Sequence, residues 1–345
     1  MQRTGLEPAG PVTIEHIAHA AGVHPASVSR ALRGVQGKVS AETRERIVQI
    51  ARELGYQPNA VAASLRTKQT NLVAIVVPDV GNPLFGPIVQ GLEAELRRHG
   101  YMSLMVQPPE DPNERRAIIL ALANRNISGL MILAAESDDP MLQAVAERSL
   151  AAVLVNRGRG ERRFSSVVND DRESVRLVLE HLASLGHTRI GHISGPLASS
   201  TGRARRDAFV ELAPGFGIQK PIVVEATAFT LPAGAAAARE LWRRSAKPTA
   251  IFAANDLIAL GALGVLREAG VRVPQEVSLV GHNDMPFLDL IDPPLTTVRV
   301  AADQMSRQSA QLLLELMREP QEPPSMRVLT PRLVVRGSTA PPSRA

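Results

Sequence analysis

Apolar residues near the start of the chain recur at helical spacing in three short stretches. Between 14 and 21 they stand at i, i+3, i+4 and i+7, which predicts a helix that Gly22 ends. A second helix is expected to begin at Pro25, since the first helical position tolerates a missing N–H. A third is predicted over 41–54, with Ser40 as its N-cap.

The second helix has two different sides. Val28, Ala31 and Leu32 share an apolar side. The opposite side carries small, polar and basic residues, namely Pro25, Ala26, Ser29, Arg30 and Arg33. Two short helices joined by a tight glycine turn, the second with such a face, predict a helix-turn-helix unit whose second helix enters the major groove of DNA. From these residues alone, an ordinary helical hairpin is the alternative.

From residue 71 onward, short continuous apolar runs alternate with helical stretches. This alternation predicts parallel sheets that are buried on both faces. A second, similar series begins near residue 167, so the fold class is α/β with two lobes. The turn-rich stretch 290–300 is expected to be a crossover from the second lobe back to the first.

The pattern also predicts the domain boundaries. They are a headpiece at 1–57, a hinge helix and linker at 58–69, an N-lobe at 70–169 with 296–328, and a C-lobe and tail at 170–295 with 329–345. Two turns of helix are unstable in isolation, so the hinge helix is expected to form only against a partner surface.

The charge distribution favours a polyanionic partner for the headpiece. Residues 1–69 hold nine basic and five acidic side chains, whereas the remaining 276 residues hold thirty and twenty-nine. The chain of 345 residues contains no cysteine, no apolar run long enough for a membrane span and no apolar leader at its start. These features indicate a cytoplasmic protein without a membrane partner.

The sequence lacks the usual motifs of enzymes with α/β folds. No G-x-S-x-G elbow, Walker phosphate loop or G-x-G-x-x-G fingerprint is present. His16 and His19 share a helix face without a third metal ligand, and His187 and His192 flank a predicted strand in structural positions. The sequence therefore predicts no enzyme, no metal and no cofactor.

Nine segments in the same order resemble the LacI–GalR family of transcriptional regulators. Among them are VTIEHIAHAAGVHPASVSRAL, VPDVGNPLF, TAIFAANDLIALGAL and VPQEVSLVGHND. The resemblance implies a helix-turn-helix headpiece, a hinge helix and a two-lobed core like that of periplasmic sugar-binding proteins. It also implies a homodimer that binds double-stranded DNA at a palindromic operator and responds to a small-molecule effector, most plausibly as a repressor.

The resemblance supplies the candidate DNA contacts. These are Thr13, Pro25, Ala26, Ser27, Ser29, Arg30, Arg33, Asn59, Val61, Ala62 and Leu65. Arg30 has the fork that suits guanine, and Leu65 matches a wedge that enters the minor groove. His24 departs from the family, which usually has a capping serine there.

Candidate effector contacts follow from the strand ends, because ligands of open α/β sheets bind beyond the carboxyl ends of the strands. That rule selects 79–85, 156–157, 194–203, 229, 255–256 and 282–284. Within these loops the resemblance favours Asp79, Phe85, Asn156, Arg157, Arg203, Phe229, Asn255 and Asp284. A sugar or related polyol is the expected effector, although the two arginines leave an anion open. A solute-binding protein of the periplasmic type is the rival function, against which the basic headpiece argues.

Overall fold

The structure is a computed structural model that describes residues 12–32, 39–56, 70–133, 139–158 and 163–343. The chain divides into two compact units, Met1–Lys68 and Gln69–Ala345. In the described parts of the chain, no helix is both long and apolar enough to cross a membrane.

The first unit contains the three helices that the apolar spacing predicts. They are α1 (Ile14–Ala21), α2 (Pro25–Leu32) and α3 (Ala41–Glu53). Gly22 ends α1 with a φ of 64°, a left-handed conformation that glycine adopts without steric cost. The three helices enclose a small apolar core that includes Ile17, Val28 and Ile47, each fully buried.

The N-lobe of the second unit is built on a sheet with strand order β11-β5-β4-β3-β1-β2, in which every pair is parallel. Its strands are β1 (Leu72–Val76), β2 (Met102–Val106), β3 (Gly129–Leu133), β4 (Ala152–Val155), β5 (Ser165–Asn169) and β11 (Met326–Leu329). Strand β2 forms one edge of this sheet.

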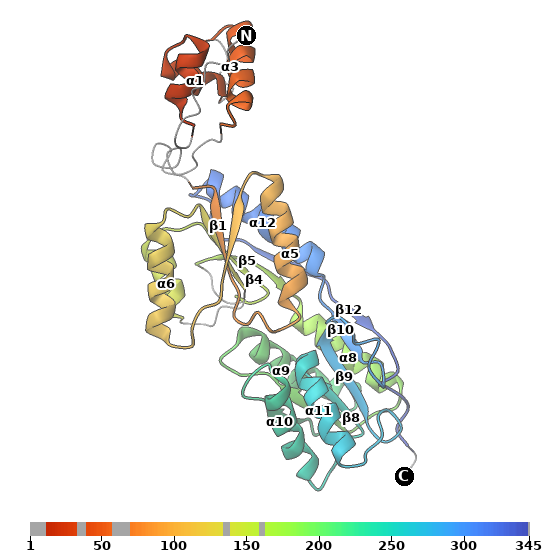
Figure 1. The fold of residues 1–345 in the computed structure, drawn as a ribbon. Coiled ribbons are helices and arrows are strands. Elements are labelled where there is room, and N and C mark those ends of the chain that lie inside the picture. Colours follow the sequence, from red (N-terminus) through yellow and green to blue (C-terminus); the bar gives the residue numbers. More distant parts are fainter. Residues whose placement is uncertain (1–11, 33–38, 57–69, 134–138, 159–162, 344–345) are drawn as a thin grey trace. The chain divides into compact units, whose positions relative to one another are not determined.

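Helices cover both faces of the N-lobe sheet (Figure 1). They are α5 (Phe85–Arg98), α6 (Pro112–Asn124), α7 (Pro140–Glu147) and α12 (Ala302–Arg318). Successive residues of a strand point to opposite faces, so Val73 and Ile75 pack toward α5 and α12, while Ala74 and Val76 pack toward α6 and α7.

The C-lobe repeats this plan with strand order β12-β10-β9-β8-β6-β7. Its strands are β6 (Ile190–Ser194), β7 (Ile222–Glu225), β8 (Ala250–Ala253), β9 (Ser278–Asn283), β10 (Thr296–Arg299) and β12 (Arg332–Val334). All pairs are parallel except β10 with β12, which is antiparallel. The edge strand β12 is thus an exception to the predicted parallel order.

Two helix pairs cover the two faces of the C-lobe sheet. The helices are α8 (Asp171–Ser184), α9 (Ser200–Leu212), α10 (Leu231–Arg243) and α11 (Asp256–Glu268), with a short 3-10 turn, η1 (Ala213–Phe216), after α9. Helices α8 and α9 pack on one face, and α10 and α11 pack on the other. The predicted two-lobed α/β fold is confirmed.

One predicted lobe boundary is wrong. We expected the chain to leave the C-lobe before residue 296, but Thr296–Arg299 forms β10 and pairs with β9 in the C-lobe sheet. The two prolines at 293 and 294 belong to a loop within the C-lobe and do not mark the end of this lobe. The β-branched residues that follow them form the next strand of the same sheet. The chain therefore crosses between the lobes near 170, 300 and 330.

Candidate functional site

Helix α2 keeps the outer face that the sequence predicts. Val28 and Ala31 are buried in the headpiece core, which turns Ala26, Ser29 and Arg30 to the other side of the helix. At the start of α2 the Ala26 N–H donates a hydrogen bond to His24 Nδ1 at 3.2 Å. The imidazole therefore satisfies one of the free N–H groups of the helix, as the family's serine would.

Side chains from α3 and the start of α1 fix the geometry around α2. Arg46 on α3 donates to the Ala21 carbonyl at the end of α1, at 2.6 Å. Thr13 is exposed at the N-cap of α1, where its N–H donates to His16 Nδ1 at 3.2 Å. Arg46 thus ties α3 to the turn between α1 and α2, while the Thr13–His16 bond caps the other end of α1.

Several predicted DNA contacts lie outside the described residues. They are Arg33 and the hinge residues Asn59, Val61, Ala62 and Leu65. The predicted contacts that the structure does describe are Thr13 and five residues of α2, namely Pro25, Ala26, Ser27, Ser29 and Arg30.

A pocket lies between the two lobes of the second unit, with about 290 Å³ of space that is partly open to solvent. Residues from both lobes line it, namely Asn82, Leu84, Phe85, Asn156, Arg157, Thr201, Arg205, Phe229, Asn255 and Asn283. Most follow the carboxyl ends of parallel strands, where open α/β sheets bind ligands.

The pocket brings together five of the eight predicted effector residues, Phe85, Asn156, Arg157, Phe229 and Asn255. Asp79, Arg203 and Asp284 are not among its lining residues. Asp79 lies in an exposed turn, where its carboxylate accepts from the Gly81 N–H at 2.8 Å. Of the additional lining residues, only Arg205 falls outside the loops chosen by the strand-end rule.

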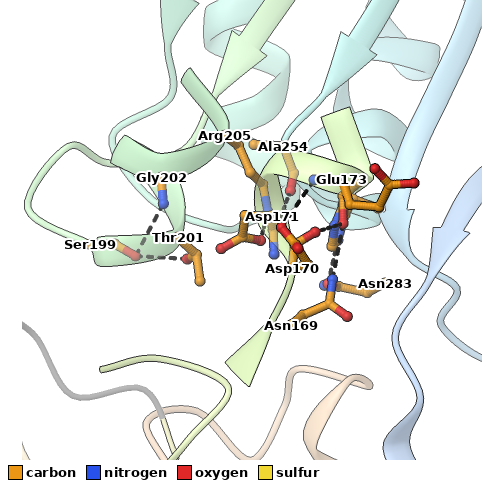
Figure 2. Close-up of polar contacts among 12 residues, drawn as sticks. Asn169, Asp170, Asp171, Glu173, Ser199, Thr201, Gly202, Arg205, Ala254 and Asn283 are labelled. Carbon is orange, nitrogen blue, oxygen red and sulfur yellow. Dashed lines mark hydrogen bonds and ion pairs between the residues drawn. The ribbon is translucent and has the colours of Figure 1, made fainter. Parts of the chain in front are cut away.

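Arg205 lines the pocket, whereas the predicted Arg203 does not. Arg203 turns back to donate to the Leu197 and Ala198 carbonyls of its own loop. Two residues further along α9, Arg205 is 2% exposed, and its Nε donates to Asp171 Oδ1 at 2.8 Å while its Nη1 donates to the Ala254 carbonyl (Figure 2). Two residues along a helix turn a side chain by about 200°, so only one of the two arginines can face the pocket.

Asp284 is likewise replaced by its neighbour, Asn283. The Asp284 carboxylate is paired with Arg299 Nε at 2.6 Å and with Arg336 Nη2 at 2.7 Å. These pairs tie the end of β9 to β10 and to the C-terminal segment. Asn283 is 6% exposed and lines the pocket instead.

The Phe229 ring packs against Gly195 on one side and contacts the Arg157 guanidinium. A Cβ built on Gly195 would lie 2.3 Å from Phe229 Cε1, so only glycine leaves room for the ring. The Arg157 guanidinium from the N-lobe stands 5.0 Å from the centroid of the same ring in the C-lobe. The two lobes therefore meet across the pocket at this pair.

Ionisable groups are buried behind the pocket in the C-lobe. Burial lowers the pKa of His192 to about 4, and its Nδ1 donates to the Phe252 carbonyl at 2.9 Å. Burial also lowers the pKa of His282 well below its usual value. Asp256 has a pKa raised to about 7, chiefly by burial, although the Thr297 hydroxyl and the Met285 N–H donate to its carboxylate.

These groups do not form a metal site. Within the described residues, no three histidine, cysteine or acidic side chains are grouped as metal ligands would be. His187 is buried and bonded to Thr249, Ser278 and the Ala340 carbonyl, and His192 stacks on the Phe252 ring at 4.7 Å.

Comparison with known proteins covers both units. Residues 13–59 match the family described as "Bacterial regulatory proteins, lacI family", and residues 179–339 match a "Periplasmic binding protein-like domain". The HTH-type transcriptional regulator DegA of Bacillus subtilis is 32% identical over 335 residues, covering 95% of this chain and 98% of DegA. The repressor CytR of Escherichia coli is 30% identical over 330 residues, covering 95% and 96% of the two chains.

Solved structures agree with these matches. A lac repressor dimer bound to operator and the anti-inducer ONPF has a TM-score of 0.86 at 27% identity, covering 96% of this chain and all of that chain. A complex of the transcriptional regulator CelR with cellobiose has a TM-score of 0.73 at 32% identity, covering 95% and 99%.

Proposed function

The chain belongs to the LacI family of bacterial regulatory proteins, and from this premise we propose that it is a cytoplasmic repressor that a small polar metabolite releases from, or recruits to, its operator. It is a DNA-binding transcriptional regulator and not an enzyme. The observation that carries this conclusion is one chain joining a helix-turn-helix unit to a two-lobed core with a pocket between its lobes. The headpiece argues against the rival function of a solute-binding protein.

We place helix α2 in the major groove. The buried side of α2 is occupied by the headpiece core, so its other side, with Ala26, Ser29 and Arg30, is the one that can reach base edges. A guanidinium can donate two parallel hydrogen bonds to guanine O6 and N7. Of these three residues, Arg30 should therefore contribute most to distinguishing guanine from the other bases.

A second copy of this chain is the expected partner of the core. Edge strand β2 exposes Met102 and Met105, whose side chains are 75% and 54% accessible. An unprotected edge strand with large apolar side chains is unfavourable in water and favours association. A dimer held together here would present two headpieces to the two halves of a palindrome.

The effector is proposed to act by bridging the lobes. Phe85 and Asn156 belong to the N-lobe, and Phe229 and Asn255 belong to the C-lobe, so a molecule among them favours one lobe arrangement. A ligand shifts an equilibrium only through unequal affinity for the two states. We expect a coupling of about 1–3 kcal/mol between effector and operator.

The test is operator binding by the full-length protein. Palindromic sites selected from a random DNA pool are measured by fluorescence anisotropy at several salt concentrations. Arg30→Ala should cost about 1–3 kcal/mol on the selected site and much less on random DNA. Arg97→Ala, which removes an exposed arginine of α5, serves as the control and should bind normally.

Equal losses for Arg30→Ala on both DNAs would show that Arg30 contacts only phosphate. Failure to select any palindrome would contradict the proposed repressor function itself.

A further inference from the structure

We infer that the interlobe pocket selects an anion, a small polyhydroxylated molecule that carries a carboxylate or a phosphate, rather than a neutral sugar. This inference rests on the proposed function, because it assigns a ligand class to the same effector pocket. It follows from which polar atoms of the lining side chains already form hydrogen bonds within the protein and which remain for a ligand.

Two asparagines of the pocket have their carbonyl oxygens occupied by backbone donors. Asn82 Oδ1 accepts from the Leu84 N–H at 3.1 Å, and Asn255 Oδ1 accepts from the Ile258 N–H at 2.8 Å as the N-cap of α11. A backbone N–H can only donate, so these contacts fix the orientation of both amides. The NH₂ group of Asn82 is left to offer a ligand, whereas that of Asn255 already donates to the Phe229 carbonyl at 3.4 Å and keeps one N–H.

Asn283 is held by a side chain rather than by the backbone. Its Oδ1 lies 3.0 Å from His282 Nδ1, a contact that holds one end of the amide and leaves the other end for the pocket. His282 is fully buried, and burial lowers its pKa and keeps the ring neutral. Asn283 therefore has one polar end of its amide left to meet a ligand.

Two arginines add further donors. Arg205 uses Nε and Nη1 on Asp171 and the Ala254 carbonyl, and no described residue accepts a hydrogen bond from its Nη2. Arg157 contributes a second guanidinium above the Phe229 ring. Asp171, which pairs with Arg205, is not itself among the lining residues.

Acceptors are few by comparison. Asn156 Oδ1 is buried and has no hydrogen-bond partner, and Thr201 Oγ1 lies 2.9 Å from Ser199 Oγ. None of the lining residues that the structure describes is acidic. Each hydroxyl of a neutral polyol brings a proton that needs an acceptor, whereas carboxylate and phosphate oxygens accept only. Charge-assisted bonds from guanidinium to such oxygens are also the stronger kind.

The test compares matched acidic and neutral probes on the full-length protein by isothermal titration calorimetry. Gluconate is paired with sorbitol, and glucose 6-phosphate is paired with glucose, each up to about 10 mM. At least one acid should bind about tenfold or more tightly than its neutral partner. The pair that shows the difference distinguishes a carboxylate ligand from a phosphate ligand.

Asn82→Asp provides the matched variant. Its carboxylate can still accept from the Leu84 N–H, so the turn is preserved, but a negative charge replaces the NH₂ group. It should weaken the acid about tenfold or more and weaken the neutral partner by less, because only the acid is repelled by the new charge. Asn283→Asp gives a second test of the same expectation, and Asn113→Asp, on the exposed surface of α6, should change nothing.

Tighter binding of the neutral probes, no binding of either acid, or unchanged acid affinity in both variants would each overturn the inference. Release or recruitment of operator by a neutral sugar would also overturn it while leaving effector-controlled repression intact. Failure of the repressor function would appear separately, in the operator measurements with Arg30→Ala.

Discussion

The buried ion pair between Asp171 and Arg205 should contribute strongly to the stability of the core. The two side chains are only 5% and 3% exposed, and the charged atoms are 2.8 Å apart. At that distance the attraction is about 6 kcal/mol for an effective dielectric constant of about 20. Removing one partner of such a pair leaves the other charge buried without compensation, which typically costs about 3–5 kcal/mol.

Asp171→Asn tests this value, because it removes the charge and changes the shape of the side chain little. Urea unfolding of the full chain can be followed through the fluorescence of the single tryptophan, Trp242 on α10 in the same lobe. We expect the free energy of unfolding to fall by about 3 kcal/mol or more. Because Arg205 lines the pocket, affinity for the effector should fall as well.

Asp207→Asn, on the helix that carries Arg205, is the matched control. Asp207 pairs with Arg206 at 2.7 Å, but the side chains are 61% and 36% exposed. An exposed pair contributes about 0–1 kcal/mol, so this variant should be nearly as stable as the wild type. A loss below about 1 kcal/mol for Asp171→Asn, equal to that of the control, would refute the reasoning.

Three further predictions concern the pocket, the histidines and the dimer. Gly195→Ala should displace the Phe229 ring and weaken effector binding about tenfold or more without affecting operator affinity, as titration calorimetry and anisotropy would measure. His192 has a pKa lowered to about 4, so as the pH falls the unfolded chain binds the proton before the folded chain does, and the free energy of unfolding decreases between about pH 6.5 and 4. His192→Gln should reduce that decrease by on the order of 3 kcal/mol, as urea titrations at several pH values would measure. Met102→Glu, on the exposed edge of β2, should shift sedimentation toward the monomer and weaken operator binding, whereas an unchanged dimer would exclude this edge from the interface.

The sequence determined the elements and their order. Helical spacing, the glycine cap at Gly22 and the proline at Pro25 are local signals, and the structure confirms the helices that they predict. The alternation of apolar runs with helices likewise predicted two parallel-dominated lobes. Such signals act over a few residues, so they can be read without knowing what packs against what.

Tertiary structure decided which side chains enter the pocket. The strands of a parallel sheet are buried on both faces, so their apolar runs carry no alternation that tells which residue points where. The sequence therefore could not separate Asn283 from Asp284, or Arg203 from Arg205, since a shift of one or two residues reverses the direction of a side chain.

The sequence also could not predict the lobe boundary near residue 300 or which atoms of each asparagine amide form hydrogen bonds within the protein. Strand β10 joins the C-lobe because β9 offers it a parallel partner, a contact that only the assembled sheet creates. The amide of Asn283 is held at one end by buried His282, a contact that no local sequence pattern reveals. Hydrogen bonds of this kind depend on burial and on distances between side chains, and both are properties of the folded chain.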